Sequence, residues 1–261
     1  MSAETSGILE KLDFPIPLFL STRYAGDLGP SWLEEHPTRE DYLRRLGIDP
    51  IRLRRVRQIH SRIVRPLFSG SAPGPGPTDV GSTPVGDGMV TDNPADVLSV
   101  TVADCMPICL YDARRGVLAL LHSGWRGTGI VRNALRVMAG RYGTKPGDVV
   151  AGLGPSIGVC CYRVDDARSA LFARRFGMSA VDRREDGPYL DLRRANICLL
   201  EEAGIGEVRD SHRCTVCDRT LGSFRREGAE RFTRMLALAT LDHVELDDAG
   251  LNDMERKDAE K

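Results

Sequence analysis

A chain of 261 residues with 41% hydrophobic and 28% charged residues has enough apolar side chains to bury the core of one large domain or two small ones. Its 36 basic and 37 acidic residues leave a net charge of −1, which does not favour a nucleic-acid-binding or membrane-surface protein. No apolar stretch approaches the roughly 20 residues that span a bilayer, and the N-terminus lacks the pattern of a signal peptide. We therefore expect a cytoplasmic protein whose seven cysteines are reduced.

The first third of the chain predicts a lead, a helix, a strand-like region and a loop. Residues 1–17 form an N-terminal lead, followed by a strand at 18–22. Residues 38–46 predict a helix that is capped by Thr38 and ended by Gly47. Strand character returns within 51–64, and the segment 70–87, rich in Gly, Pro and Ser, predicts a mobile surface loop.

Short runs of apolar and β-branched residues predict strands in the middle of the chain. The turn DARRG between the last two of them predicts a hairpin and therefore antiparallel pairing. These predicted strands cover residues 88–91, 97–102, 106–111 and 117–121.

Helices alternate with strands in the second half. Apolar spacing predicts helices at 128–142, 165–176 and 190–203 and a strand at 149–153, whereas 232–241 fits a helix or a strand equally well. The mixture indicates an α+β (mixed α/β) fold with a mixed, largely antiparallel sheet flanked by helices. We expect a single domain over residues 18–243 and a charged C-terminal tail over residues 244–261.

One cysteine and two histidines stand where predicted strands give way to loops, which is where folds tend to place chemistry. Cys105 follows Asp104 at a break between two strands, His122 precedes Ser-Gly-Trp-Arg-Gly, and His60 lies in RQIHS. Taken alone, His122 is explained equally well as a structural residue, and Cys105 and His60 are explained better that way. Together, two imidazoles and one thiolate suit Zn²⁺ and leave a fourth position open for water or substrate.

Two neighbours of these residues have both a functional and a structural interpretation. Arg126, beside glycines and a helix start, is suited to an anion, but taken alone it is better explained by a surface salt bridge. Asp104 is a candidate outer partner for a metal-bound histidine or a proton carrier, and a turn-capping role is as well supported.

A second group of cysteines lies outside this set. Cys214 and Cys217 form a C-x-x-C pair, which is half of a structural zinc site or a redox pair. No second C-x-x-C exists in the sequence, and the adjacent Cys160 and Cys161 do not have ligand spacing. We therefore expect buried thiols or a loop in the wall of the site rather than a separate zinc site.

Several segments together resemble the laccase-domain family, also called polyphenol oxidoreductase-like or YfiH-like proteins. They cover residues 18–241 and include GDGMVTDNP, VTVADCMPICLYD, GVLALLHSGWRGT, GLGPSIGVCCYRV, YLDLRRAN and CTVCD with SFRREG. The resemblance implies a YfiH-like fold and a purine nucleoside phosphorylase with adenosine deaminase side activity. It also implies that His60, Cys105 and His122 hold a catalytic zinc. Copper fits less well, because a multicopper oxidase needs more histidines than the five present.

The activity that the resemblance implies turns a purine nucleoside and phosphate into the free base and ribose 1-phosphate. The nucleoside stays open among adenosine, inosine, guanosine and methylthioadenosine. Departures from the family pattern lie in the parts that would line the substrate, namely Ala25 for glycine, Phe224 for tyrosine and Glu227 for aspartate. The residues expected to act in catalysis are Cys105, His122, His60 and Asp104, and those expected to bind phosphate are Arg23, Arg126 and Arg225.

Other functions remain open at this point. A metal-free thiol hydrolase or deamidase would use Cys105 as nucleophile and His122 as base, and the family's fold is similar to that of bacterial toxin deamidases with such a pair. The family's label also suggests a polyphenol oxidoreductase, and a non-catalytic binding protein is a further alternative. His60 favours the metal site, because a Cys–His pair does not need it. We expect a monomer or a weak homodimer with no nucleic-acid or membrane partner.

Overall fold

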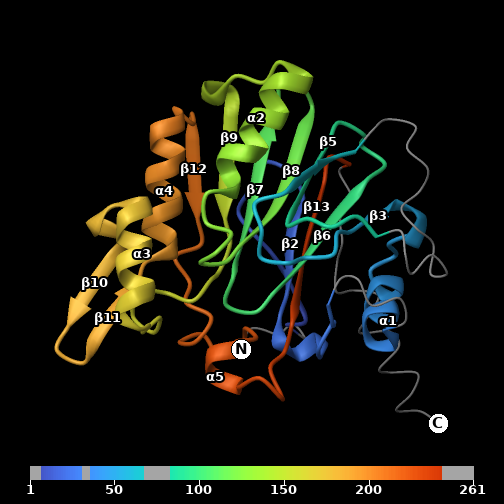
Figure 1. Cartoon of the computed structure of the whole chain (residues 1–261). Helices are drawn as coiled ribbons and strands as arrows, with labels where there is room; N and C mark the ends of the chain where they lie inside the picture. Colours follow the sequence, from blue (N-terminus) through green and yellow to red (C-terminus); the bar gives the residue numbers. More distant parts are fainter. Residues whose placement is uncertain (1–6, 31–35, 68–82, 243–261) are drawn as a thin grey trace, which may run out of the picture.

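Two β-sheets pack face to face, and helices cover their outer faces (Figure 1). The computed structural model describes residues 7–30, 36–67 and 83–242. The five-stranded sheet has the order β1-β2-β13-β6-β3, and all its pairs are antiparallel except β3 with β6. Its strands are β1 (Leu9–Lys11), β2 (Leu18–Ser21), β13 (Met235–Thr240), β6 (Val97–Val102) and β3 (Leu53–Arg54).

The six-stranded sheet has the order β12-β9-β7-β8-β5-β4, with antiparallel pairs at its centre and parallel pairs at both edges. A separate hairpin joins β10 (Val181–Arg184) to β11 (Gly187–Leu190). The strands of the larger sheet are β12 (Glu207–Asp210), β9 (Val149–Leu153), β7 (Met106–Asp112), β8 (Val117–Ser123), β5 (Gly88–Thr91) and β4 (Val64–Pro66).

The central strands are apolar along their whole length because both of their faces are buried. In β8, Leu118 and Leu120 face the core between the two sheets, whereas Ala119 and Leu121 face the helical layer. This alternation follows from the two-residue period of a strand. The inter-sheet core therefore fixes the register of the strands whose ends build the site.

Helices close the two outer faces. Helix α1 (Pro37–Arg45) packs on the five-stranded sheet, and α2 (Ile130–Tyr142) and α4 (Leu192–Ala203) pack on the six-stranded sheet. Helix α3 (Asp166–Phe176) forms a smaller core with the β10–β11 hairpin. The remaining helices are short: α5 (Phe224–Glu227), η1 (Arg23–Ala25), η2 (Pro50–Arg52), η3 (Pro146–Asp148) and η4 (Met178–Ala180).

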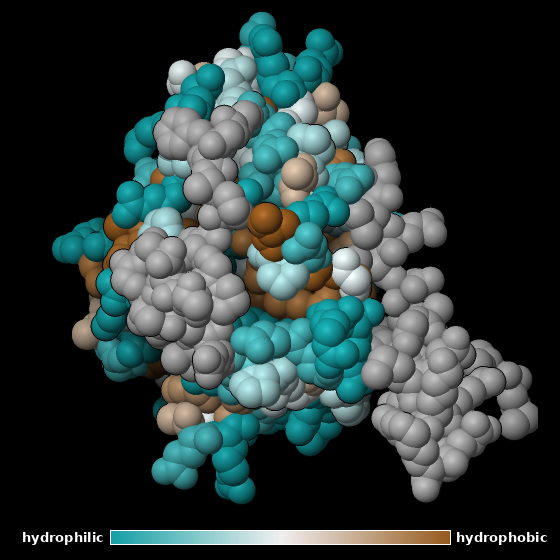
Figure 2. All heavy atoms as spheres, turned by 90° about the vertical axis from the view of Figure 1, so that its right-hand side faces the viewer, coloured by the Kyte–Doolittle hydropathy of each residue, from teal (hydrophilic) through white to brown (hydrophobic). Residues whose placement is uncertain are grey.

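On the face that lies on the right in Figure 1, the residues coloured by hydropathy are mostly hydrophilic, and hydrophobic side chains show in a small central area and at the left margin (Figure 2). Within the described parts of the chain, no helix combines the length and the apolar character needed to cross a bilayer.

The structure confirms the α+β class, although the strands divide between two sheets. The strands expected at 97–102 and 149–153 have those bounds, the DARRG hairpin joins β7 to β8, and the ambiguous segment 232–241 contains β13. The expected cap Thr38 is wrong: α1 begins at Pro37, and the Nδ1 atom of His36 accepts the Arg39 N–H at 3.4 Å. Proline suits this first helical position because its missing N–H has no partner there.

Two other expectations change with the structure. The strand character within 51–64 is confined to β3 and the first residue of β4, and a loop that carries His60 joins them. The predicted mobile loop 70–87 lies mostly outside the described residues, but its last residue, Asp87, is fully buried. The predicted tail lies outside the described residues, and the domain limits stay a prediction; residues 7–17 contribute β1 and buried apolar side chains to the packing.

Candidate metal centre and cavity

Three side chains from distant parts of the chain converge at one end of the two sheets. The ligand atoms of His60, Cys105 and His122 all lie within 4.8 Å of one another. His122 is near the end of β8, Cys105 lies in the short connection from β6 to β7, and His60 comes from the loop between β3 and β4. The antiparallel register of β7 with β8 brings the start of one strand beside the end of the other, which places Cys105 next to His122.

Gly124 is the point where the HSGWRG segment passes Cys105. A Cβ atom on Gly124 would lie 2.7 Å from the Sγ atom of Cys105 and 3.3 Å from the Cδ2 atom of His60. The first distance is shorter than a van der Waals contact, so a side chain at this position must displace the thiol. This close approach explains why glycine follows His122 and Ser123 in the motif.

We expect Gly124→Ala to lose bound metal and activity while it keeps the fold. The added methyl group displaces the sulfur of Cys105 from its place beside both histidines. Gly140→Ala is the matched control, because Gly140 lies within α2 with nothing within 4 Å of its added Cβ, and alanine there stabilises a helix by about 0.5–1 kcal/mol. Metal content and thermal unfolding of both variants check this, and a Gly124→Ala protein with full metal content would contradict it.

Asp87 orients both histidines, and the sequence analysis did not single it out. Its carboxylate contacts the Nδ1 atom of His122 at 2.9 Å and accepts backbone N–H groups of His60 at 2.9 Å and of Ser61 at 2.6 Å. The contact to Nδ1 leaves the Nε2 atom of His122 free for a ligand. A signal for this role exists in the sequence, because metal-binding histidines need an outer carboxylate and Asp87 stands directly before β5.

Strained backbone marks two of the predicted site residues. His60 has a φ of 59° and Asp104 has a φ of 81°, in the left-handed region that residues with a Cβ atom rarely adopt. Such positions persist only where the surrounding structure holds them, and they cluster at functional sites. At His60 the hydrogen bonds from the three backbone N–H groups of residues 59–61 and from the Ser61 hydroxyl to Asp87 hold the loop in this conformation.

The charges in this cluster favour a thiolate next to an imidazolium. Burial alone would raise the pKa of Cys105, but the charge and hydrogen bond of His122, followed by those of His60, lower it to about 6. Burial would lower the pKa of His122, but Cys105 and Asp87 raise it to about 9. The cysteine is therefore already in the form that binds a metal or acts as a nucleophile at neutral pH.

We expect the metal-free protein to be alkylated at Cys105 with a rate that rises through about pH 6, well below the ordinary range of a thiol. Because the folded pKa is lowered, the thiolate is present above it and is lost as the pH falls through it. His122→Asn should shift this midpoint upward, because it removes the charge that lowers the pKa of Cys105 and leaves the effect of burial, which raises it. Peptide mapping after iodoacetamide treatment measures the rate, and Cys109, whose pKa burial raises, should stay inert as an internal control.

The carboxylate of Asp104 points into the loops of the late part of the chain rather than to the histidines. Its oxygens accept the hydroxyls of Thr215 at 2.6 Å and Ser223 at 2.7 Å and the backbone N–H of Arg225 at 2.6 Å. These three donors occupy a buried carboxylate. Asp104 therefore anchors the wall of the cavity beside Cys105, and Asp87 is the partner of the histidine.

A cavity of about 510 Å³ opens over the three ligand-type side chains. Of the arginines expected to bind phosphate, Arg225 lines it, whereas Arg23 and Arg126 are exposed and are not among its lining residues. Arg168 and Arg234 line it instead, and the sequence analysis did not single out either of them. Aromatic rings form much of the remaining wall: Trp125, Tyr162, Phe224 and Phe232.

Tyr162 belongs to the aromatic wall and lies close enough to Cys105 and Arg225 to feel their charges. Burial, followed by the charge of Cys105, raises the pKa of Tyr162 to about 12. Its hydroxyl therefore stays protonated at neutral pH and can donate a hydrogen bond to a ligand. Arg225 stacks at 5.4 Å from this ring, and Arg168 lies 4.8 Å from the ring of Trp125.

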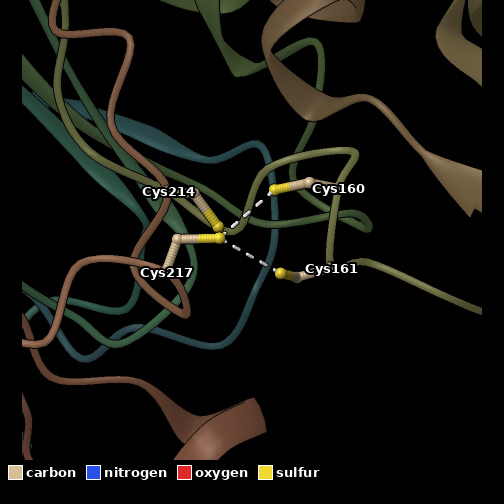
Figure 3. A group of neighbouring side chains, drawn as sticks. All are labelled: Cys160, Cys161, Cys214 and Cys217. Atoms are coloured by element: carbon tan, nitrogen blue, oxygen red, sulfur yellow. Dashed lines mark hydrogen bonds between the residues drawn. The ribbon is translucent and has the colours of Figure 1, made fainter.

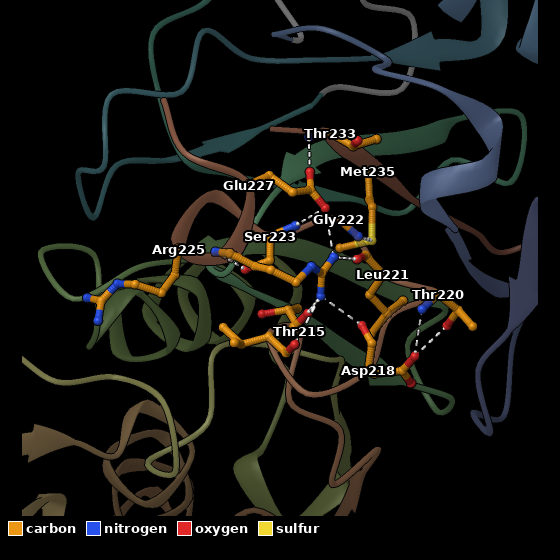
Figure 4. Close-up of polar contacts among 12 residues, drawn as sticks. Thr215, Asp218, Thr220, Leu221, Gly222, Ser223, Arg225, Glu227, Thr233 and Met235 are labelled. Atoms are coloured by element: carbon orange, nitrogen blue, oxygen red, sulfur yellow. Dashed lines mark hydrogen bonds and ion pairs between the residues drawn. The ribbon is translucent and has the colours of Figure 1, made fainter. Parts of the chain in front are cut away.

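The two arginines of SFRREG have different roles. The side chain of Arg226 lies within the loop and donates to the carbonyls of Thr215 at 2.6 Å and Asp218 at 3.1 Å. It also pairs with Glu227, whose other oxygen accepts the N–H of Thr233 at 2.6 Å. Figure 4 shows this network, from which the side chain of Arg225 points away. Glu227 thus supports the loop, and Arg225 is the arginine that reaches the cavity.

The residues present fit a metal ion. Two imidazoles and a thiol of lowered pKa supply the nitrogen and sulfur donors that Zn²⁺ prefers. A ligating histidine also needs an outer carboxylate that fixes its tautomer, and Asp87 supplies one for His122. Copper accepts the same donor types, so the donor set alone does not identify the metal.

The fold and this cluster define an α+β protein with a His–Cys–His candidate metal centre at one end of two packed sheets. Residues 36–242 match the pattern of the multi-copper polyphenol oxidoreductase laccase family, and the chain belongs to that family.

Solved structures with the same fold include Bacillus licheniformis hypothetical protein YfiH, with a TM-score of 0.77 and 27% identity over 89% of this chain and 98% of that one. YlmD from Geobacillus stearothermophilus superposes with a TM-score of 0.74 and 28% identity over 91% of this chain and 93% of that one. A curated relative from the same organism, named purine nucleoside phosphorylase YlmD, is 36% identical over 159 residues, which is 58% of either chain. This match thus spans just over half the length of that relative.

Proposed function

We propose that this chain is a zinc-dependent purine nucleoside phosphorylase. The observation that carries the proposal is the convergence of His60, Cys105 and His122 at a cavity whose wall is both aromatic and cationic. A purine base needs flat apolar surfaces, and phosphate needs guanidinium groups, so this cavity suits both substrates. The name of the curated relative, purine nucleoside phosphorylase, supports the same reaction.

In this reaction an oxygen of phosphate attacks C1′ of the ribose while the bond from C1′ to the purine nitrogen breaks. The purine leaves with the electron pair of that bond and takes up a proton, and ribose 1-phosphate remains. Arg168 and Arg225 would hold the phosphate dianion, and the hydroxyl of Tyr162 would donate to a substrate oxygen. The rings of Trp125 and Phe224 would pack against the base.

His60, Cys105 and His122 would hold the zinc ion, with Asp87 orienting the histidines. When bound, the ion supplies Lewis-acid polarisation at its open fourth position. The chain's own contribution is to keep Cys105 deprotonated and the Nε2 atom of His122 free.

Arginine variants test the assignment of the phosphate site. We expect Arg168→Met to raise the KM for phosphate by about tenfold or more, because one charge-assisted hydrogen bond contributes about 1.5–3 kcal/mol. Arg126→Met is the matched control, since Arg126 is exposed and does not line the cavity. Initial rates at varied phosphate check this, and equal effects of the two changes would contradict it.

The direct test is elemental analysis of the purified protein together with an assay on adenosine and phosphate before and after chelation. Bound zinc and formation of ribose 1-phosphate that is lost on chelation support the proposal. The same assay reports inosine, and so it measures the deaminase activity that the family resemblance implies. A protein that forms no ribose 1-phosphate from any purine nucleoside would overturn the proposal.

A metal-free thiol hydrolase or deamidase is the second candidate, and one observation favours it. Asp87, His122 and Cys105 follow one another as a carboxylate, an imidazole and a thiol, which is the order of groups in a Cys–His–Asp triad. Such an enzyme would keep its activity in a chelator and lose it to a thiol alkylator. His60 favours the metal, because it also hydrogen-bonds the sulfur of Cys105, which a triad does not require.

A further inference from the structure

We infer that Cys160, Cys161, Cys214 and Cys217 form a second, structural zinc site that fastens two loops of the cavity wall together. The sequence predicted buried thiols or a loop in the wall of the site at these positions, and the inference goes beyond that prediction. Cys160 and Cys217 are exposed, Cys161 and Cys214 are half-buried, and all four are free thiols. The inference does not depend on the proposed function.

The four sulfur atoms are spaced as in a tetrahedral zinc site. All lie within 4.8 Å of one another, and the Sγ atom of Cys217 is 3.6 Å from that of Cys160 and 3.5 Å from that of Cys161. A tetrahedral ion with Zn–S bonds of about 2.3 Å places its sulfur ligands about 3.8 Å apart. A disulfide would need about 2.05 Å. Figure 3 shows the four side chains pointing toward one another from two segments.

The sequence spacing hid this set because its halves lie on different loops. Cys214 and Cys217 belong to a turn, in which the N–H of Asp218 donates to the carbonyl of Cys214 at 2.8 Å. Cys160 and Cys161 are adjacent, which does not resemble a C-x-x-C motif. They lie in a turn that follows β9. In this turn the N–H of Gly158 donates to the sulfur of Cys214 at 3.2 Å, and this hydrogen bond joins the two loops.

The surroundings act differently on the thiols: burial and the neighbouring sulfur atoms raise the pKa values of Cys160 and Cys161, whereas backbone donors lower that of Cys214 despite its burial. The Cys217 and Val216 N–H groups also donate to the sulfur of Cys214, and such donors stabilise a thiolate. Guanidinium groups bind carbonyls of the same loops: Arg225 donates to Cys161 at 3.2 Å and Arg184 to Val159 at 3.2 Å.

Both loops supply parts of the cavity. Ile157 and Tyr162, on either side of the first cysteine pair, line it. Thr215, between Cys214 and Cys217, donates its hydroxyl to Asp104 beside Cys105. A metal bound by the four cysteines therefore holds the wall in place without contacting a ligand in the cavity.

Zinc content of the full-length protein and its variants tests the inference. We expect Cys105→Ala to keep about one zinc per chain and the pair Cys160→Ser/Cys217→Ser to lose about one relative to the wild type. Cys198→Ser, a half-buried cysteine outside both clusters, should lose none. If only the second site binds zinc, the wild type holds one zinc ion and the pair variant holds none. This result would contradict the zinc centre of the proposed function and leave the present inference intact. Equal zinc in the pair variant and the wild type would overturn the inference.

A measurement on the wild type keeps the test valid if the pair variant does not fold. Exposed Cys160 and Cys217 should resist iodoacetamide in the native protein and react once a chelator has removed the metal. Peptide mapping reads this site by site. Equal labelling with and without the chelator, or an intact mass that reveals a disulfide within the four, would overturn the inference.

Discussion

Replacing Cys105 by alanine should abolish phosphorolysis and remove the metal from the first centre while leaving the fold intact. Three protein ligands hold a catalytic zinc, and loss of the only thiolate among them leaves two imidazoles. The half-buried Cys105 lies in a connection between strands rather than in the inter-sheet core, so its truncation removes little packing. We expect the loss in kcat/KM to reach at least about 10³-fold, as for other groups central to catalysis.

The measurements are metal content, circular dichroism and initial rates with adenosine and phosphate. Cys109→Ala is the matched control, since Cys109 is a buried cysteine on β7 that contacts the inter-sheet core. It should lower thermal stability and keep the metal and the reaction. A Cys105→Ala protein that retains full phosphorolysis would refute the assignment of the centre.

Asp87→Asn should weaken metal binding by about 10- to 100-fold, the range measured for outer partners of ligating histidines. The change keeps the shape of the side chain but replaces one acceptor oxygen by a donor. In place of Oδ1 that donor would face the Nδ1 atom of His122 and the N–H of His60, and in place of Oδ2 it would face the N–H groups of Ile59 and Ser61. Either arrangement leaves a buried group unpaired, and this also lowers the free energy of unfolding by about 1–3 kcal/mol.

The pKa of this carboxyl gives a pH test of the same contacts. Burial would raise the pKa of Asp87, but hydrogen bonds from His122 and Ser61 lower it below its ordinary value. A lowered folded pKa means that the stabilisation is complete above the unfolded value and is lost as the pH falls through the folded one. Asp87→Asn should therefore lose stability at neutral pH and little in acid.

Asp96→Asn separates the role in the metal centre from the loss of a buried carboxylate. Asp96 is equally buried and accepts hydrogen bonds from Thr91 at 2.6 Å and Arg54 at 2.7 Å, among residues that do not line the cavity. It should lower the free energy of unfolding and leave metal affinity unchanged. Metal titration of the two variants checks this, and equal affinities would show that Asp87 does not orient the ligands.

Local patterns predicted most elements, because the core strands are continuous apolar runs and α2, α3 and α4 carry apolar residues at helical spacing. They missed β10 and β12, whose residues are largely polar and partly exposed, and the four-residue β11, which begins with Gly187 and Pro188. They also did not predict two sheets. No local signal shows that β6 pairs with the distant β13 rather than with β7, the next strand along the chain. Such pairings depend on residues far apart in sequence.

The same limit explains what was and was not foreseen at the site. His60, Cys105 and His122 could be proposed from residue type and motif, and the structure brings them together. Asp87 and Arg168 act through contacts with residues far from them in sequence, so local spacing did not single them out. For Asp87, the need of a ligating histidine for an outer carboxylate is the signal that could have found it. The sequence did not predict a cluster of four cysteines for the same reason, since their closeness follows from the meeting of two loops.

The shortest link between the two sheets has a mechanical consequence. Residues 103–105 are the whole connection from β6 in one sheet to β7 in the other, and they include Asp104 in its strained conformation. Because this connection is only three residues long and includes Cys105, we expect any sliding of one sheet over the other to move Cys105. Mutations in the core between the sheets should therefore alter the reaction from a distance, so that inactive variants need not map to the cavity itself.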